Sequence, residues 1–175
     1  MVSVTTSIVD ELPHLRRYAF VLASDRTLAE DLVQDCVERA INRQHQYQPG
    51  TNFRSWLFTI LRGQFLNHRR SARVRRVEPL DDGVATLNPS VTSNQEAHAE
   101  LRQIEAALEK LSPTHRDVLL LVVIEGFAYE DAAEVLQVPV GTVRSRLARA
   151  REALAARLGR PAAPGPAAQP ERAEA

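Results

Sequence analysis

The sequence predicts an all-α protein with two small helical domains joined by a flexible linker, the second domain ending in a helix-turn-helix. Apolar residues recur at helical spacing in both halves, and a stretch with prolines, a glycine and little periodicity separates them. The chain has 175 residues, 44% of them hydrophobic, which suffices for two cores. We expect domains at 1–76 and 96–158, a flexible linker at 77–95 and a disordered tail at 159–175.

Charge is segregated along the chain, although 22 basic and 22 acidic residues give a formal net charge of zero. Residues 54–76 hold seven arginines and no acid, whereas residues 10–39 hold seven acids and four arginines. One face of the protein therefore suits nucleic acid, and another suits a basic partner.

The single cysteine, Cys36, excludes an intramolecular disulfide or a cysteine cluster for zinc, and it fits a reducing compartment. It lies on an apolar helical stripe, so we expect it to be buried. The N-terminus lacks the basic-then-apolar pattern of a signal peptide, and the longest apolar run, at 118–124, is too short to cross a bilayer. These features predict a cytoplasmic protein without membrane insertion.

Two amphipathic helices open the first domain. The first is expected from about Pro13 to Ala23, because proline is tolerated near a helix start. The second begins at Thr27, which has the spacing of a capping box with Glu30. Its apolar face comprises Ala29, Leu32, Val33, Cys36, Val37 and Ala40.

The opposite face of this second helix is acidic. It comprises Glu30, Asp31, Gln34, Asp35 and Glu38. Such a face is often only solvated. Alternatively it docks a basic partner helix, because carboxylates beside a neutral amide can pair and hydrogen-bond along one line. The charge pattern leaves both interpretations open.

A polar loop at 44–52 leads to a helix from Phe53 to about Arg70, which Asn52 is placed to cap. Its inward residues are Phe53, Leu57, Ile60 and Leu61, with Gln64 as a further candidate. Arginines interleaved with aromatic residues fit either a core helix with a solvated basic side or a platform for bases and phosphates. Gly63 costs about 1 kcal/mol relative to alanine and marks a kink or a close contact.

In the second domain, a helix at 96–111 precedes Ser112 and Pro113, an N-cap and first-turn proline for a helix that ends at Ile124. The apolar run within this helix should be the centre of the second core. The helix-turn-helix follows at 129–154.

The first helix of this motif buries Tyr129, Ala132, Ala133 and Leu136, and its acids Glu130, Asp131 and Glu134 are expected to face water. Pro139, followed by Gly141, forces a turn. Thr142 is the expected N-cap of the next helix. The buried seam of that helix comprises Val143, Leu147, Ala150 and Leu154.

The face opposite this seam carries Ser145, Ala148, Arg149 and Glu152, flanked by Arg144, Arg146 and Arg151. Small and polar groups between arginines suit a helix in the major groove of DNA. A solvated basic helix is the alternative. DNA binding is favoured because residues 144–160 hold six arginines and one acid, and the pattern begins at a helix N-terminus.

Nothing in the sequence indicates catalysis, a metal or a cofactor. Asp81 and Asp82 fall in the linker, without a histidine or other ligand at a useful spacing. The five histidines follow no ligand pattern. We therefore expect a protein that is not an enzyme.

Three segments in this order resemble the sigma factors of the extracytoplasmic-function (ECF) type, which are two-domain initiation factors of bacterial transcription. They are AEDLVQDCVERA at 29–40, FRSWLFTILR at 53–62, and the stretch 112–154 that contains the helix-turn-helix. The resemblance covers nearly all of residues 12–158. It implies that the protein binds core RNA polymerase and promoter DNA.

The resemblance also implies roles for individual residues. The acidic face would dock on the clamp helices of the largest polymerase subunit through Asp31, Gln34 and Asp35, with Glu38 on the same face. The loop at 47–53 and the helix after it would open the minus-ten promoter element, and a flipped base would enter a pocket by this loop. The residues for this element are Tyr47, Asn52, Arg54, Trp56, Arg62, Asn67, Arg69 and Arg70. Those for the duplex minus-thirty-five element are Thr142, Arg144, Ser145, Arg146 and Arg149.

Two details refine the resemblance. Gly63 stands where the family usually has an asparagine, so the side chain for a base contact is missing there. The stretch FAYEDAAEVLQVPVGTVRSR at 127–146 is similar to the subgroup that drives the general stress response in some proteobacteria. This similarity implies a small helical anti-sigma factor that sequesters both domains.

Two other functions fit parts of the sequence. A helix-turn-helix regulator that acts without polymerase would use the same basic helix, but it leaves the acidic stripe and the aromatic-basic helix unexplained. It usually also needs a dimer, and no zipper-like heptads are present. A nucleic-acid enzyme would need a nucleophile, a metal cluster or a phosphate loop, and none is apparent.

Overall fold

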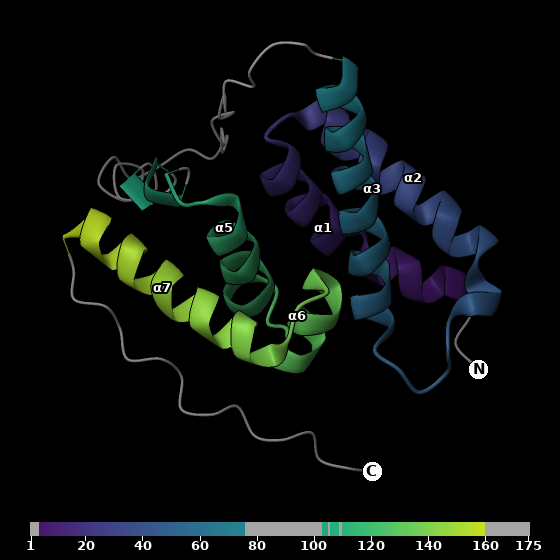
Figure 1. The fold of residues 1–175 in the computed structure, drawn as a ribbon. Helices are drawn as coiled ribbons and strands as arrows, with labels where there is room; N and C mark the ends of the chain where they lie inside the picture. The colour runs from purple at the N-terminus through teal and green to yellow at the C-terminus, as the bar shows by residue number, and fades with distance from the viewer. Residues whose placement is uncertain (1–3, 76–102, 105, 109, 160–175) are drawn as a thin grey trace, which may run out of the picture. The chain divides into compact units, whose positions relative to one another are not determined.

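The computed structural model describes residues 4–75, 103–104, 106–108 and 110–159. These residues form helices and the turns between them, with no strand in the described ranges, which confirms the predicted all-α class. They divide into two compact units: the first holds α1, α2 and α3, and the second holds α5, η2 and α7 together with α6 up to Ala133 (Figure 1). No described helix is both long and apolar enough to span a membrane.

Helix α1 (Val4–Ala23) continues through Pro13 instead of beginning there, so the predicted start is wrong. An interior proline removes one helical hydrogen bond and costs about 3 kcal/mol. Ile8, more than a turn before Pro13, is only 3% exposed. Its burial and the hydrogen bonds of the first turns offset the cost of the proline.

Helix α2 (Arg26–Asn42) begins after a reversal at Ser24, whose φ of 53° is left-handed. Its N-cap is Asp25, whose carboxylate accepts a 2.7 Å hydrogen bond from the Leu28 amide. The predicted cap at Thr27 is therefore wrong. The carboxylate satisfies a free amide of the first turn and also interacts favourably with the helix dipole.

A short 3-10 turn, η1 (Gln44–Gln46), and a loop lead to helix α3 (Phe53–Arg75), which runs past its predicted end. Asn52 caps α3 as predicted, because its side-chain oxygen accepts a 3.2 Å hydrogen bond from the Ser55 amide. A Cβ added at Gly63 would meet no atom within 4 Å, so the predicted close contact there is wrong, and α3 is continuous through this glycine.

The three helices of the first unit pack on one another around a shared core. At its centre the rings of Tyr18 and Phe58 have centroids 5.0 Å apart. The residues around them that are fully buried are Leu15, Ala19, Cys36, Ala40, Leu57 and Leu61. Cys36 is buried as predicted, and its thiol donates a 3.4 Å hydrogen bond to the Leu57 carbonyl.

Ser112 caps α5 (Pro113–Leu119) as predicted, and α5 passes into a π-helical turn, η2 (Leu120–Ile124). The turn closes where the Glu125 amide donates to the Leu120 carbonyl at 2.8 Å. Gly126, with a φ of 71°, then ends the helix, and the Phe127 amide donates to the Leu121 carbonyl at 2.9 Å. Residues 118–122 are buried as predicted, whereas Val123 and Ile124 are 52% and 49% exposed, so the core includes less of this run than expected.

Helices α6 (Tyr129–Leu136) and α7 (Val140–Leu158) form the predicted helix-turn-helix. The left-handed residue of the turn is Gln137, with a φ of 55°. Thr142 is not the N-cap: α7 begins at Val140, and the Thr142 amide already donates to the Pro139 carbonyl at 2.8 Å.

Most of the predicted burial in these two helices is correct. Val143, Leu147 and Ala150 form the buried seam of α7, which packs on α5. In contrast, Asp131 is 6% exposed, so the expectation that it faces water is wrong. Asp131 takes part in an interaction that the helical pattern does not reveal. The predicted linker, the tail beyond Gly159 and most of the helix predicted at 96–111 lie outside the described residues.

Candidate functional site

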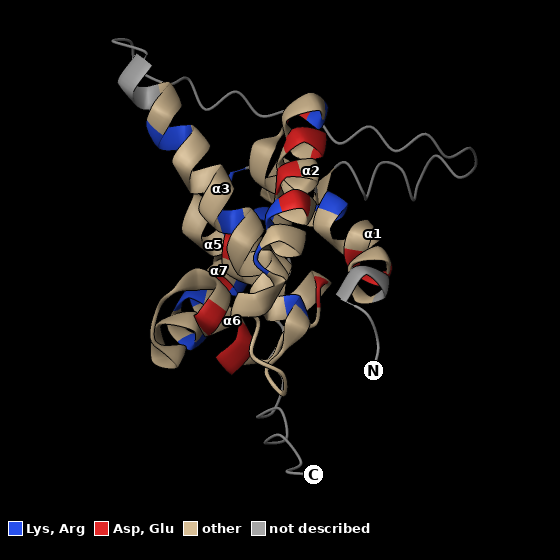
Figure 2. Ribbon diagram, turned by 90° about the vertical axis from the view of Figure 1, so that its right-hand side faces the viewer, with Lys and Arg blue, Asp and Glu red and all other residues tan. Residues whose placement is uncertain are grey.

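The acidic residues recur along α2, where they are red in Figure 2. On the acidic face of this helix, Asp31, Gln34, Asp35 and Glu38 are all exposed, as the sequence predicts. The Gln34 amide donates a 3.2 Å hydrogen bond to Glu38, so these two side chains are ordered along the helix. Glu30, at the edge of this face, pairs with Arg16 of α1 at 3.3 Å.

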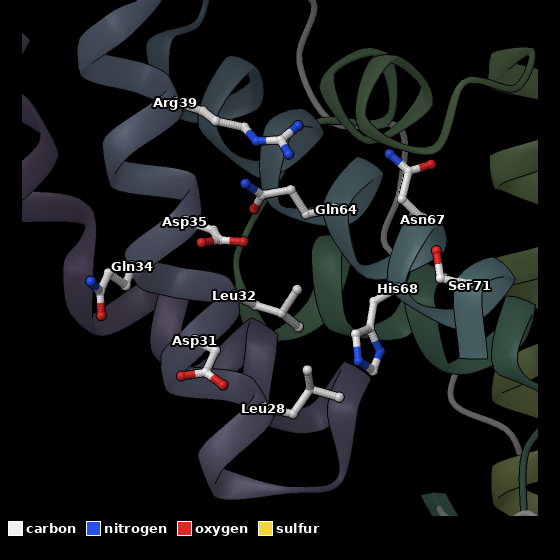
Figure 3. Close-up of a pocket in the computed structure, with 10 residues that line it drawn as sticks. All are labelled: Leu28, Asp31, Leu32, Gln34, Asp35, Arg39, Gln64, Asn67, His68 and Ser71. Carbon is white, nitrogen blue, oxygen red and sulfur yellow. The ribbon is translucent and has the colours of Figure 1, made fainter. Parts of the chain in front are cut away.

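A groove with a volume of about 530 Å³ runs between this face and α3 (Figure 3). Helix α2 contributes Leu28, Asp31, Leu32, Gln34, Asp35 and Arg39 to its lining. Helix α3 contributes Gln64, Asn67, His68 and Ser71. Part of the candidate polymerase surface therefore borders a cavity that α3 completes.

An aromatic cluster organises the loop before α3. The Tyr47 ring lies 5.1 Å from Phe53 and 5.5 Å from Trp56, measured between centroids. The Tyr47 hydroxyl donates to the Thr51 carbonyl at 2.7 Å, and the Thr51 hydroxyl donates to the Gln48 carbonyl at 2.8 Å. The loop therefore has a defined shape, held against the start of α3 by ring packing.

The arginines of α3 have different surroundings. Arg54 is turned toward α1, where its Nε lies 3.0 Å from Glu11 Oε2 and an Nη lies 2.7 Å from His14 Nδ1. The Glu11 contact is electrostatic, because these atoms lack the angles of a hydrogen bond. Arg62 is half-buried, whereas Asn67, Arg69 and Arg70 are exposed near the C-terminal end of the described side chains.

The outward face of α7 presents the predicted polar set. Arg144, Ser145 and Arg149 are exposed, and Thr142 and Arg146 are half-buried. The Arg144 guanidinium lies 5.7 Å from the Tyr129 ring centroid and 4.0 Å from Glu130, so α6 helps to position it. A row of arginines with small residues between them can fit a groove lined by phosphates.

Metal or thiol chemistry has no support in the described part of the chain. No group of three or more histidine, cysteine, aspartate or glutamate side chains could hold a metal ion there. Burial raises the pKa of the Cys36 thiol to about 12, so it stays protonated near neutral pH and cannot act as a nucleophile.

The amino-acid sequence is similar to the sequences of proteins of known class. The chain is 42% identical over 156 residues to the ECF RNA polymerase sigma factor EcfG of Rhodopseudomonas palustris, over 89% of this chain and 85% of that relative. The chain belongs to the ECF family of RNA polymerase sigma factors. Its residues 8–62 match the sigma2 domain of PhyR, and residues 101–154 match region 4 of sigma-70. This sigma factor is also 37% identical to SigL of Mycobacterium tuberculosis, over 80% of each chain.

Solved structures share the fold of this sigma factor. RpoE of Bartonella quintana, solved in complex with the anti-sigma factor NepR, gives a TM-score of 0.71 with 35% identity, over 89% of this chain and 96% of that one. CnrH, solved in complex with the cytosolic domain of CnrY, gives a TM-score of 0.63 with 29% identity, over 89% of this chain and 87% of that one.

Sequence reasoning missed the partners of Arg54 and the groove beside Asp35. Glu11 and His14 lie one turn apart on α1, but Glu11 precedes the predicted start of this helix at Pro13, so the prediction contained no signal for a polar face there. The groove gave no signal, because its two walls come from α2 and α3 and their packing determines its shape.

Proposed function

We propose that this sigma factor binds core RNA polymerase through the acidic face of α2 and directs it to promoters through α3 and α7. The observation that carries the proposal is the segregation of charge: exposed carboxylates line one face of α2, and exposed arginines line the outward face of α7. A protein that joins a basic protein surface to DNA phosphates needs both signs on separate surfaces. The function requires no catalytic group, metal or cofactor.

We assign polymerase binding to Asp31, Gln34, Asp35 and Glu38. All four are exposed on one face of α2, and the Gln34–Glu38 hydrogen bond reduces the side-chain entropy that docking would cost. The clamp helices of the largest subunit are the proposed basic partner.

We assign the minus-ten element to the loop and helix that begin at Tyr47. The pre-formed aromatic cluster offers ring faces for an unstacked base, and the exposed Asn67, Arg69 and Arg70 can follow the backbone. Asn52 already caps α3, so its part is to hold the loop. Arg54 contacts DNA only if it leaves Glu11 and His14, and the half-buried Arg62 requires a close approach by the strand.

We assign the duplex minus-thirty-five element to Thr142, Arg144, Ser145, Arg146 and Arg149 on α7. Ser145 donates to the Thr142 carbonyl at 3.1 Å, which leaves its oxygen free to accept from a base while the flanking arginines contact phosphates. We propose that the domain at 1–76 recognises the minus-ten element and that the domain at 96–158 recognises the minus-thirty-five element.

Regulation by a cytoplasmic anti-sigma protein is part of the proposal. It is supported by the solved complexes of RpoE with NepR and of CnrH with the cytosolic domain of CnrY. Similarity to EcfG and to the PhyR domain supports a place in a stress-response subgroup.

Co-elution with core RNA polymerase on a sizing column tests the function. The wild-type chain is expected to co-elute, and Asp35→Arg is expected to abolish co-elution because it places a cation on the docking face. Asp10→Arg makes the same charge change at an exposed position of α1 and should co-elute normally. A wild-type chain that binds duplex DNA but not polymerase would instead indicate a helix-turn-helix regulator.

A further inference from the structure

Gln64 is a buried amide without a hydrogen bond. The residue is 5% exposed, and neither its Oε1 nor its Nε2 has a partner among the described residues. A leucine would fill the same place without burying unpaired polar atoms. Buried amides are nearly always paired, so an unpaired one in a native protein requires an explanation.

The amide of Gln64 faces the groove between α2 and α3. Figure 3 shows the side chain projecting from α3 toward α2, where it lies between Asp35 and Arg39. Neither of these neighbours forms a hydrogen bond with it. The exposed side chains of Asp31, Asp35 and Arg39 line the same groove, so an entering group meets two carboxylates and one guanidinium.

The polar groups of the groove determine what it can hold. The two carboxylates outnumber the one guanidinium of Arg39, so the groove disfavours phosphates and acidic side chains, and the unpaired amide disfavours an apolar side chain. A guanidinium is planar and carries five donors, so it can bond to a carboxylate and to an amide oxygen together. A lysine ammonium is a compact point charge without this fork, and it is more strongly hydrated.

We propose that the groove receives an arginine side chain from a basic helix of RNA polymerase, with its guanidinium between the Asp35 carboxylate and Gln64 Oε1. The Nε2 of Gln64 then donates to a carbonyl of the same partner. This inference rests on the proposed function, since it names the side chain that the acidic face selects. It makes Gln64, on α3, a specificity-determining residue of a surface otherwise built by α2.

The direction of the effects of substitutions at position 64 tests the inference. Affinity of the full chain for core RNA polymerase is measured by fluorescence anisotropy for the wild type, Gln64→Leu and Gln64→Glu. Gln64→Leu is expected to weaken binding about tenfold, because it removes a hydrogen bond to a charged group. Gln64→Glu is expected to strengthen binding severalfold at low salt and less at high salt, because it adds an anion beside the guanidinium.

Two further measurements separate binding from folding. Thermal unfolding of the free chain should show Gln64→Leu at least as stable as the wild type, because the unpaired amide is gone. If that variant is less stable, Gln64→Met, which keeps an unbranched side chain, replaces it. Gln44→Leu removes an exposed amide in η1 and should bind polymerase like the wild type.

Three outcomes overturn the inference without touching the proposed function, provided that Asp35→Arg still abolishes binding. Unchanged affinity of Gln64→Leu would mean that nothing occupies the groove. Tighter binding of Gln64→Leu would mean that the occupant is apolar, and weaker binding of Gln64→Glu would mean that it is not a cation. Failure of the wild type to bind polymerase would instead overturn the proposed function.

Discussion

The Nε of Arg54 lies 3.0 Å from Glu11 Oε2, so the first arginine of α3 is joined to α1 within the first unit. The two side chains are 24% and 22% exposed, which shields the pair from solvent. The Arg54 guanidinium also reaches His14 Nδ1 at 2.7 Å. An Nη of Arg17 lies 2.9 Å from the same nitrogen, so two arginines meet at His14 Nδ1.

Loss of this pair should destabilise the first unit. We expect Arg54→Ala and Glu11→Ala each to lower the free energy of unfolding by about 1–2 kcal/mol, and the double variant to lose less than the sum. Urea unfolding measures the free energy of unfolding of the single variants and of the double variant. Arg16→Ala is the control, since the Arg16 and Glu30 side chains are 55% and 53% exposed and their pair should contribute little. Equal losses in Arg54→Ala and Arg16→Ala would contradict a structural role for Arg54.

Polymerase binding and duplex binding should be separable by mutation. Arg149→Ala removes an exposed guanidinium of α7 and is expected to weaken binding to a duplex promoter site by about 1–3 kcal/mol while polymerase affinity stays unchanged. Asp31→Arg should do the reverse. Anisotropy with duplexes selected from a random library by the wild-type chain gives the first affinity, and anisotropy with core polymerase gives the second. Similar losses in both assays would refute the separation of roles.

Gly63 should be replaceable with a gain in stability. A Cβ at this helical position meets open space, so Gly63→Ala is expected to raise the free energy of unfolding by about 0.5–1 kcal/mol. Thermal unfolding should show a higher midpoint. Gly50→Ala is the opposite control, because a φ of 92° strains any residue with a Cβ. A lower midpoint for Gly63→Ala would show that this side of α3 is occupied in the folded chain.

The Cys36 thiol should make stability fall at alkaline pH. Burial raises its pKa from 9.0 to about 12, so the folded state holds the proton longer than the unfolded state does. The stabilising contribution is therefore complete below pH 9 and is lost as the pH rises toward 12. Relative to Cys36→Ala, the wild type should lose about 1.4 kcal/mol per pH unit within this window.

Urea unfolding at several pH values between 8 and about 10.5 measures this difference. A thiol reagent at pH 8 provides the control, because it should label Cys36 slowly in the folded chain and quickly in urea. Parallel pH profiles for the wild type and Cys36→Ala would show that the thiol does not carry the effect.

Helical periodicity predicted the faces of α2 and α7 well, because burial of residues such as Leu32 and Val143 follows from a repeat of 3.6 residues. The caps at Asn52 and Ser112 were predicted correctly, whereas three other helix starts were predicted wrongly. At Pro13, Thr27 and Thr142 the residue at which the helix begins depends on several neighbouring start and cap positions. The free energies of a helix that begins at one or another of these positions differ by only about 1–3 kcal/mol. Packing around Ile8 decided one of these cases and the carboxylate of Asp25 decided another.

In the candidate site, too, some features could be predicted from the sequence and others could not. The acidic face of α2 could be predicted because a single helix carries all of it. The Arg54 pair and the Gln64 groove could not, because each depends on how two separate helices pack, which the periodicity within one helix does not determine. Asp131 illustrates the difficulty, since its place on α6 predicts exposure and yet the residue is only 6% exposed.

The π-helical turn at 120–124 affects how this protein can evolve. Its ring, closed from Glu125 to Leu120, contains one residue more than an α-helical ring. The extra residue is contained within this ring, so its deletion would leave a ring of α-helical size. The loss of one codon is therefore a change that this turn can accommodate, whereas the loss of one codon within α5 itself would rotate the segments on either side by about 100° relative to each other.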